Sequence, residues 1–293
     1  MRRTMLYLPG NNPNMLLKGY LFAPDGIILD LEDSVPLGEK VSARVLVREA
    51  IRGWEFGGCE VTVRINGLDT PYVQYDLEEI VPLGISGIRV PKVEDPAEVA
   101  DLDRTMSKLE AQAGLQVGST KIFCLLETAR GVLRAFDIAT ASSRVAAIIP
   151  GGEDLAADLK TSRSKEGTEL EWARRYVVMA ARAAGVDPLD TVYPDVNDPE
   201  GLEREVRFIR QLGFEGKSVI HPNQIRVIHR VFTPSKEEVL RARRIVEAAR
   251  EAEAKGLGAV ALDGRMIDAP VVKRAIRTLE LAEAMGGGDR HDG

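Results

Sequence analysis

Acidic residues follow apolar segments at several points of this 293-residue chain. Glu127 comes directly after the apolar run "KIFCLL", and Glu153 and Asp154 follow "VAAII" through the turn Pro150-Gly151-Gly152. Carboxylates that gather in a partly dry pocket repel one another, so they stay ionised together only when a cation lies among them. Oxygen ligands with few histidines favour Mg²⁺, with Mn²⁺ as the alternative, over zinc. These residues therefore predict a magnesium site.

Basic residues near the same segments suggest two further chemistries. Arg64 ends "EVTVR", and its planar guanidinium could bind a substrate carboxylate through two hydrogen bonds. Lys92 could act instead as the Schiff-base lysine of a metal-free aldolase. Structural alternatives stay open, because Asp33 and Asp154 could cap helices and His221 could be a hydrogen-bonded structural residue.

The elements that must position these residues alternate along the chain. Eight apolar segments lack strict alternation, which is typical of parallel strands buried on both faces, and amphipathic segments lie between them. We predict strands at 5–9, 26–33, 60–66, 87–93, 121–128, 145–154, 190–196 and 217–222. We predict helices at 38–52, 96–113, 130–142, 168–185, 199–213 and 235–255.

This order predicts a TIM (β/α)8 barrel, whose active site lies at the C-terminal ends of the strands. An open doubly wound sheet is the alternative, but the turn after the first strand carries only one glycine. We expect the barrel strands and helices in 1–234. Residues 235–285 should hold the last barrel helix and a C-terminal helical extension, and 286–293 should be a disordered tail.

Composition narrows the class of protein. The net charge of −6 and the absence of clustered Lys and Arg argue against nucleic acid and membrane partners. No stretch approaches the roughly 20 apolar residues of a membrane span, and no signal peptide is evident. Cys59 and Cys124 are expected to be reduced thiols, which indicates a cytoplasmic protein.

Several motifs resemble those of the HpcH/HpaI aldolase superfamily and, within it, the citrate lyase β-subunit-like proteins. They occur in the expected order over nearly the whole chain: "RRTMLYLPGNNPNML", "DGIILDLEDSVPLGEKVSAR", "VRING", "GIRVPKVE", "LLETARGVLRAFDIA", "GGEDLAADL", "LGFEGKSVIHPNQIRVI" and "GRMIDAPVVKRA".

The resemblance implies a TIM barrel that binds Mg²⁺ through Glu127 and Asp154. It makes Arg64 the residue that holds a 2-oxo acid. Gly152 and Glu153, together with Arg64 and Glu127, are implied to contact the substrate, because the glycine turn lets the backbone approach a ligand closely.

Further roles follow from the same resemblance. Glu32 and Asp33 are implied to act in catalysis by holding metal-bound water. Lys40 and Arg44 are candidates for contacts with coenzyme A phosphates. Asp268 resembles a catalytic residue that family members insert into the active site of a neighbouring subunit.

The implied reaction cleaves a 3-hydroxy-3-carboxy acyl thioester to an acetyl thioester and a 2-oxo acid. Citryl, citramalyl and malyl thioesters remain open as substrates, and the carrier is coenzyme A or an acyl carrier protein. A homotrimer is expected. The competing hypotheses are the metal-free Schiff-base aldolase with Lys92 and a non-catalytic subunit of a lyase complex.

Overall fold

The computed structural model describes residues 1–254, 256 and 258–286. The chain forms two compact units, Met1–His229 and a second unit that begins at Arg230. The predicted boundary at 234/235 lies five residues from this division.

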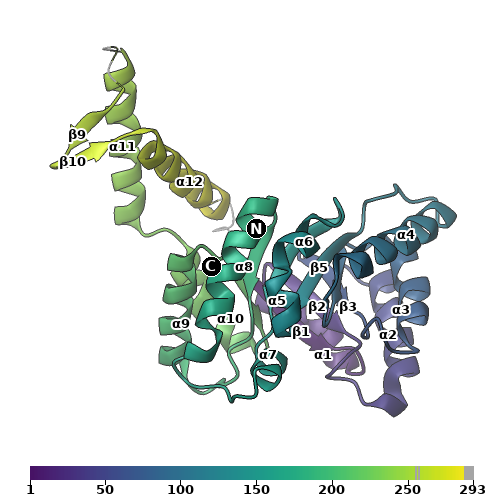
Figure 1. Cartoon of the computed structure of the whole chain (residues 1–293). Helices are drawn as coiled ribbons and strands as arrows, with labels where there is room; N and C mark the ends of the chain where they lie inside the picture. Colours follow the sequence, from purple (N-terminus) through teal and green to yellow (C-terminus); the bar gives the residue numbers. More distant parts are fainter. Residues whose placement is uncertain (255, 257, 287–293) are drawn as a thin grey trace. The chain divides into compact units, whose positions relative to one another are not determined.

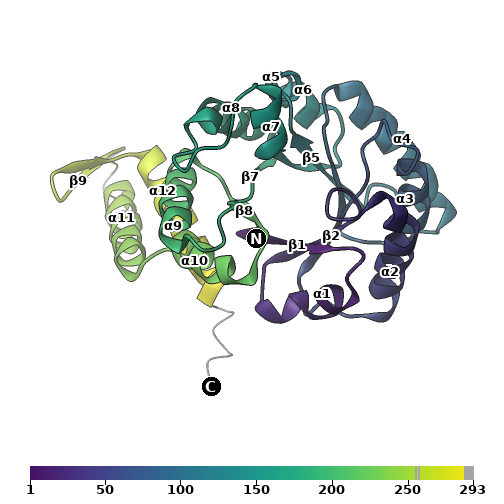
Figure 2. The ribbon, with the colours of Figure 1, turned by 90° about the horizontal axis from the view of Figure 1, so that it is seen from below.

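The first unit is a closed barrel of parallel strands in sequence order, which confirms the predicted TIM barrel (Figure 1). Seen in Figure 2, helices surround the ring of strands. The strands are β1 (Thr4–Pro9), β2 (Gly26–Asp30), β3 (Glu60–Arg64), β4 (Gly87–Val90), β5 (Lys121–Leu126), β6 (Val145–Pro150), β7 (Asp187–Asp190) and β8 (Gly216–Val219).

The seventh predicted strand, 190–196, is wrong except for its first residue. The observed strand β7 is the preceding segment "DPLD", which pairs with β6 and β8. Its two aspartates and its proline have low strand propensity, so the sequence did not indicate a strand there. Most of the other predicted strands run two to four residues too far. Their polar ends, such as 31–33 and 151–154, lie in the turns that follow the strands.

Helices follow the strands, and prolines begin several of them. Pro13, Pro96 and Pro199 each occupy the first turn of a helix, where no backbone N–H is needed. The helices of the first unit are α1 (Pro13–Lys18), α2 (Lys40–Gly53), α3 (Val73–Ile80), α4 (Pro96–Gln112), α5 (Ala129–Leu133), α6 (Ala135–Thr140), α7 (Glu153–Asp158), α8 (Thr168–Ala184), α9 (Pro199–Leu212) and α10 (Pro222–Phe232), and short 3₁₀ helices cover Gly19–Phe22, Leu37–Glu39 and Val81–Leu83.

Two helix predictions need correction. The predicted helix at 130–142 is two helices, α5 and α6, which meet at Arg134. The helix that follows β8 is α10, so the last barrel helix does not lie within 235–285 as predicted. Its sequence is strongly amphipathic, and Pro222 marks its start.

The second unit confirms the helical character of the C-terminal extension. An antiparallel β9–β10 hairpin separates two helices that pack against each other around Ala242, Ile245, Ile267 and Ala275. Its elements are α11 (Lys236–Ala254), β9 (Val260–Leu262), β10 (Arg265–Ile267) and α12 (Ala269–Gly286). The predicted tail lies, from residue 287 on, outside the described residues.

Apolar side chains fill most of the barrel interior, which also holds the buried Arg89, and charged groups gather at the C-terminal ends of the strands. One cluster joins Met5, Ile28, Phe123, Ile149 and Leu189, each from a different strand. Burial of these side chains stabilises the barrel by roughly 1.5–3 kcal/mol each. None of the helices in the described part of the chain has the length and apolar character needed to span a membrane.

Candidate active site

The predicted metal and substrate residues line one cavity of about 380 Å³ at the barrel mouth, whereas Glu32, Lys40, Arg44 and Asp268 do not line it. Arg64, Glu127, Asp154 and Asp33 come from four different strand ends and all line it. The remaining lining residues are Tyr7, Asp30, Ser34, Leu125, Ile149, Pro150, Gly151, Gly152, Glu153, Thr191, Val192, Ser218 and Ile220. The fold thus brings together residues that lie up to 213 positions apart in sequence.

The turn Gly151-Gly152 allows two strand ends to approach each other. A Cβ atom on Gly151 would lie 2.6 Å from Cγ of Glu127 and 2.8 Å from its Cα, so no other residue fits without displacing the glutamate. The Gly151 N–H also donates to the Leu126 carbonyl at 2.8 Å. The glycines therefore place α7, and with it Asp154, beside Glu127.

The charge of Asp154 acts on Glu127 at the mouth of the barrel. Burial and then the charge of Asp154 raise the pKa of Glu127 to about 7, although the charge of Arg64 opposes the shift. The N-cap of α7 is Gly152, and no side chain caps this helix, so Asp154 is not a helix cap. The arrangement fits the donor set of a cation site.

Lys92 supplies a positive charge between these carboxylates. Its Nζ lies 3.4 Å from Oδ1 of Asp154 and 3.9 Å from Oε1 of Glu32, and its backbone N–H donates to Oε2 of Glu127 at 3.0 Å. Its φ of 53° lies in the left-handed region, which is unfavourable for a lysine. Burial lowers the pKa of Lys92, but the charges of Asp154 and Glu32 outweigh burial and raise it.

Arg64 is held by carboxylates of its own chain. Nε and Nη2 donate to the two oxygens of Asp30 at 2.6 and 2.8 Å, and Nη1 lies 2.8 Å from Glu32 and 3.1 Å from Asp33. Asp33 therefore pairs with Arg64 rather than capping a helix.

Glu32 is a buried carboxylate at the edge of this group. Burial, together with the charges of Asp33 and Glu127, raises its pKa to about 8, although the charge of Arg64 opposes the shift. It lines a neighbouring cavity of about 350 Å³ together with Asp33 and Lys92.

The geometry gives no support to contacts of Lys40 and Arg44 with coenzyme A phosphates. Both side chains are buried. Lys40 Nζ donates to the carbonyl oxygens of Leu31 and Glu32 at 2.8 and 2.7 Å, and Arg44 Nε donates to Asp76 at 2.7 Å. These contacts fix the turn after β2 and join α2 to α3.

Gly152 and Glu153, which are predicted to contact the substrate, both line the cavity. Gly152 is buried between Thr191 and Arg163, since a Cβ atom there would lie within 2.8 Å of both side chains. Glu153 lines the same cavity with an exposed side chain.

Asp195 and His221 do not line the cavity, although the sequence placed them near strand ends. Asp195 accepts from the Asn197 N–H, and Nδ1 of His221 accepts from the Asn223 N–H. The structural interpretation of His221 agrees with this contact.

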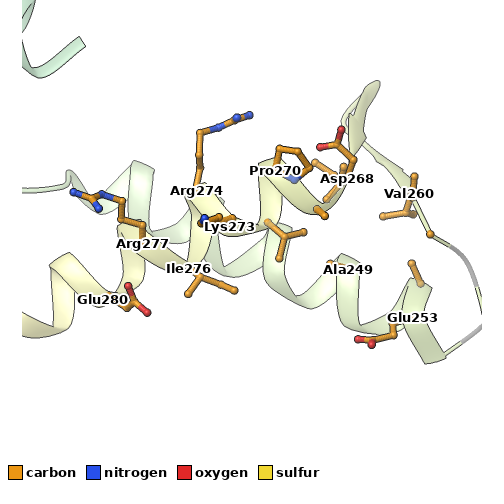
Figure 3. Close-up of a pocket in the computed structure, with 16 residues that line it drawn as sticks. Ala249, Glu253, Val260, Asp268, Pro270, Lys273, Arg274, Ile276, Arg277 and Glu280 are labelled. Atoms are coloured by element: carbon orange, nitrogen blue, oxygen red, sulfur yellow. The ribbon is translucent and has the colours of Figure 1, made fainter. Parts of the chain in front are cut away.

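Asp268 lies in the second unit and begins α12 (Figure 3). Its Oδ1 accepts from the Val271 N–H at 3.2 Å, which is an N-cap contact. It also lines a cavity of about 910 Å³ on this unit, with Pro270, Lys273 and Ile276 nearby.

Several residues of the mouth were missing from the predicted site, among them Asp30, Tyr7 and Ser218. Asp30 was visible as an acid at the end of β2, but only the structure shows its pairing with Arg64. Tyr7 and Ser218 carried no signal, because one is an aromatic residue in an apolar strand and the other a hydroxyl in a strand.

The donor set fits Mg²⁺ better than a metal that needs a complete protein cage. Among the described residues, no three His, Cys, Asp or Glu side chains are grouped to hold a metal. Glu127 and Asp154 are a pair of hard oxygen donors, and Mg²⁺ commonly takes one or two carboxylates and fills its other positions with water and substrate.

Comparison with known proteins identifies the family of this chain. The HpcH/HpaI aldolase/citrate lyase family matches residues 3–222. Citrate lyase subunit beta of Leuconostoc mesenteroides subsp. cremoris is 45% identical over 97% of this chain and 94% of its own length. The (3S)-malyl-CoA thioesterase of Cereibacter sphaeroides (strain ATCC 17029 / ATH 2.4.9) is 35% identical over 97% of this chain and 95% of its own.

A solved structure is similar over almost the full length. It is that of the protein CitE from Mycobacterium tuberculosis in complex with magnesium, acetoacetate and coenzyme A, with 32% identity and a TM-score of 0.80 over 96% of this chain and 98% of that chain. The chain therefore belongs to the HpcH/HpaI aldolase/citrate lyase family and is a carbon–carbon lyase.

Proposed function

We propose that this chain cleaves a citryl thioester to an acetyl thioester and oxaloacetate in a Mg²⁺-dependent reaction. The observation that carries the proposal is the pairing of Glu127 with Asp154 in the same cavity as Arg64. The choice of citryl over malyl substrate rests on the higher identity to a citrate lyase subunit, 45% against 35% for the malyl-CoA thioesterase. Citramalyl and malyl thioesters are the alternatives.

The chain's residues supply binding and orientation. Glu127 and Asp154 would hold the Mg²⁺ ion, and Glu32 and Asp33 its water. When bound, the ion supplies a Lewis acid that lowers the pKa of the substrate hydroxyl. Arg64 binds the carboxylate of the departing oxo acid and keeps it in line with the breaking bond. Gly152 and Glu153 border the substrate in the same cavity.

The hydroxyl gives its proton to the Glu32 and Asp33 carboxylates and becomes the carbonyl of the oxo acid, while the electrons of the broken carbon–carbon bond pass to the α-carbon of the acetyl thioester. A carboxylic acid must then protonate the enolate carbon. We assign this step to Asp268 of a neighbouring copy in a homotrimer. Met266 is about two-thirds exposed in the segment before Asp268, and its burial against another copy would favour this assembly.

The acyl carrier is coenzyme A in the CitE complex. We propose the same carrier here, with an acyl carrier protein as the alternative. Both cysteines, Cys59 and Cys124, are free, which suits the reducing cytoplasm that we propose as the location.

The competing chemistry finds less support. A Schiff-base lysine needs a lowered pKa, whereas the carboxylates around Lys92 raise its pKa. A non-catalytic subunit would have no need to hold Glu127 and Asp154 together in a shared cavity. Borohydride trapping with a 2-oxo acid would leave a covalent adduct only in the Schiff-base mechanism.

The decisive experiment assays citryl-, citramalyl- and malyl-CoA in parallel, with Mg²⁺ and without carrier protein. Glu127→Ala and Asp154→Ala should each abolish Mg²⁺-dependent cleavage while both variants fold. Glu171→Ala, which removes an exposed carboxylate of α8, is the matched control and should keep full activity. Near-normal activity of either site variant after chelation and Mg²⁺ restoration would refute the metal assignment, and cleavage restricted to a citryl carrier protein would refute the coenzyme A assignment.

A further inference from the structure

Arg89 lies inside the barrel without a carboxylate partner. Its side chain, on β4, is fully buried. Its Nη1 donates to Oγ of Ser218 at 3.2 Å, but Nε and Nη2 have no hydrogen-bond partner among the described residues. Arg174, which is equally buried, instead pairs with Asp190 and Glu205. A buried guanidinium normally requires such an anion.

Two aromatic rings partly stabilise the positive charge of Arg89 in place of a carboxylate. The Arg89 Cζ lies 5.8 Å from the ring centroid of Tyr7 and 5.6 Å from that of Phe123. Arg64 also contacts the Tyr7 ring, at 4.9 Å, and Arg2 contacts the Phe123 ring, at 5.0 Å. Guanidinium groups and aromatic rings thus alternate in the order Arg2, Phe123, Arg89, Tyr7 and Arg64. Arg64, at the end of this row, lines the cavity.

Ser218 connects this buried charge to the cavity. A serine hydroxyl has one hydrogen to donate and lone pairs that accept, whereas a guanidinium only donates. Because Ser218 Oγ accepts from Arg89, its own hydrogen must point elsewhere. No acceptor in the described part of the chain receives that hydrogen, and Ser218 lines the cavity with Tyr7 and Arg64.

We propose that Ser218 donates a hydrogen bond to an oxygen of the bound 2-oxo acid and that Arg89 is the residue that positions it. Arg89 orients the hydroxyl by donating a hydrogen bond to one lone pair of its oxygen. Its positive charge, 3.2 Å from that hydroxyl oxygen, also favours an anionic ligand in the cavity. A carboxylate or carbonyl oxygen of the substrate would then accept the hydrogen bond from Ser218, while Arg64, at the end of β3, binds the same substrate. This inference rests on the proposed function.

A double-mutant cycle on oxo acid binding tests the proposal. Binding of oxaloacetate and of pyruvate is measured by calorimetry with Mg²⁺ present, for the wild type, Ser218→Ala, Arg89→Met and the double variant. We expect Ser218→Ala to weaken binding about tenfold, as for one hydrogen bond to a charged group. Arg89→Met should weaken it at least as much, and the second substitution should then add less than a threefold loss, because the hydroxyl is no longer oriented.

Thr62→Val is the matched control. Thr62 is another buried hydroxyl of a barrel strand, which donates to the Ile27 carbonyl at 3.1 Å and does not line the cavity. This variant should lose stability but keep its affinity for oxo acids. If Arg89→Met does not fold, Ser218→Ala and Thr62→Val still separate a ligand contact from a structural hydroxyl.

Unchanged affinity in Ser218→Ala would overturn the ligand contact, and fully additive losses would overturn the positioning role of Arg89. A wild-type protein that binds no 2-oxo acid at all would instead refute the proposed function. The two failures are therefore distinguishable.

Discussion

Arg64 and Asp30 form a two-point ion pair between directly opposed residues of neighbouring strands. The strand register aligns Asp30 of β2 with Arg64 of β3, and the two hydrogen bonds measure 2.6 and 2.8 Å. Burial alone would raise the pKa of Asp30, but the hydrogen bonds and charge of Arg64 hold it below its ordinary value. The pair stays charged and fixes the plane of the guanidinium, whose Nη1 lies against Glu32 and Asp33.

Arg64→Lys should weaken oxo acid binding more than conservation of charge would suggest. A lysine can make neither the fork to Asp30 nor two parallel bonds to a carboxylate. We expect a loss of roughly 1.5–3 kcal/mol, or one to two decades of affinity, by calorimetry with oxaloacetate or pyruvate and Mg²⁺. Arg175→Lys, which changes an exposed pair on α8, is the control. An unchanged affinity would place the carboxylate site elsewhere.

Gly151→Ala should disrupt the site without unfolding the barrel. The added Cβ atom would lie 2.6 Å from Cγ of Glu127, and the turn or the glutamate must move. A displacement on the order of 1 Å can cost about 100-fold in rate. Gly38→Ala serves as the control, because its Cβ atom would meet nothing within 4 Å. Equal thioester cleavage rates in the two variants would contradict the close approach of the two strand ends.

Acid should weaken the barrel in part through Glu110. Burial would raise the pKa of this carboxyl, but hydrogen bonds from Arg144 and from the backbone N–H groups of Thr120 and Gly118 lower it to about 2. The folded pKa lies below the ordinary value of 4.5, so the stabilisation is present above pH 4.5 and is lost as the pH falls towards 2. It amounts to roughly 3 kcal/mol at neutral pH.

Urea unfolding of Glu110→Gln, followed by circular dichroism, checks this contribution. The variant should be less stable than the wild type at pH 7, and the difference should shrink as the pH is lowered from 4.5 to 2. Glu171→Gln should follow the wild type throughout, because Glu171 is exposed. A difference that does not change with pH would show that Glu110 is not titrating in this range.

Asp268→Ala and Glu127→Ala should complement each other. If active sites are shared between copies, mixed oligomers formed after mild dissociation contain some sites with both intact residues. We expect each variant alone to be inactive and the mixture to recover part of the cleavage rate. Absence of recovery, with subunit exchange confirmed by mass spectrometry, would show that each chain works alone and that Asp268 is only the N-cap of α12.

The order of elements and the acids at strand ends could be predicted because both are local properties. Apolar runs and Pro-started helices indicated seven of the barrel strands, and the strand-end rule placed Glu127 and Asp154 together. The sequence did not predict β7, because Asp187, Pro188 and Asp190 are polar or helix-breaking residues. This segment is extended only because it pairs with β6 and β8.

Partners of the charged side chains could not be predicted, since they depend on register and on side-chain packing across the barrel. The sequence by itself determined that Arg64 would stand at the barrel mouth. Only the tertiary structure decided that Asp30 holds it, because the two are 34 residues apart and meet through parallel pairing. The same holds for Lys40 and Arg44, whose sequence position suggested exposed phosphate contacts. Folding instead buries both side chains against backbone carbonyls and Asp76. Leaving these buried acceptors without a donor would cost more free energy than ordering the lysine and arginine side chains.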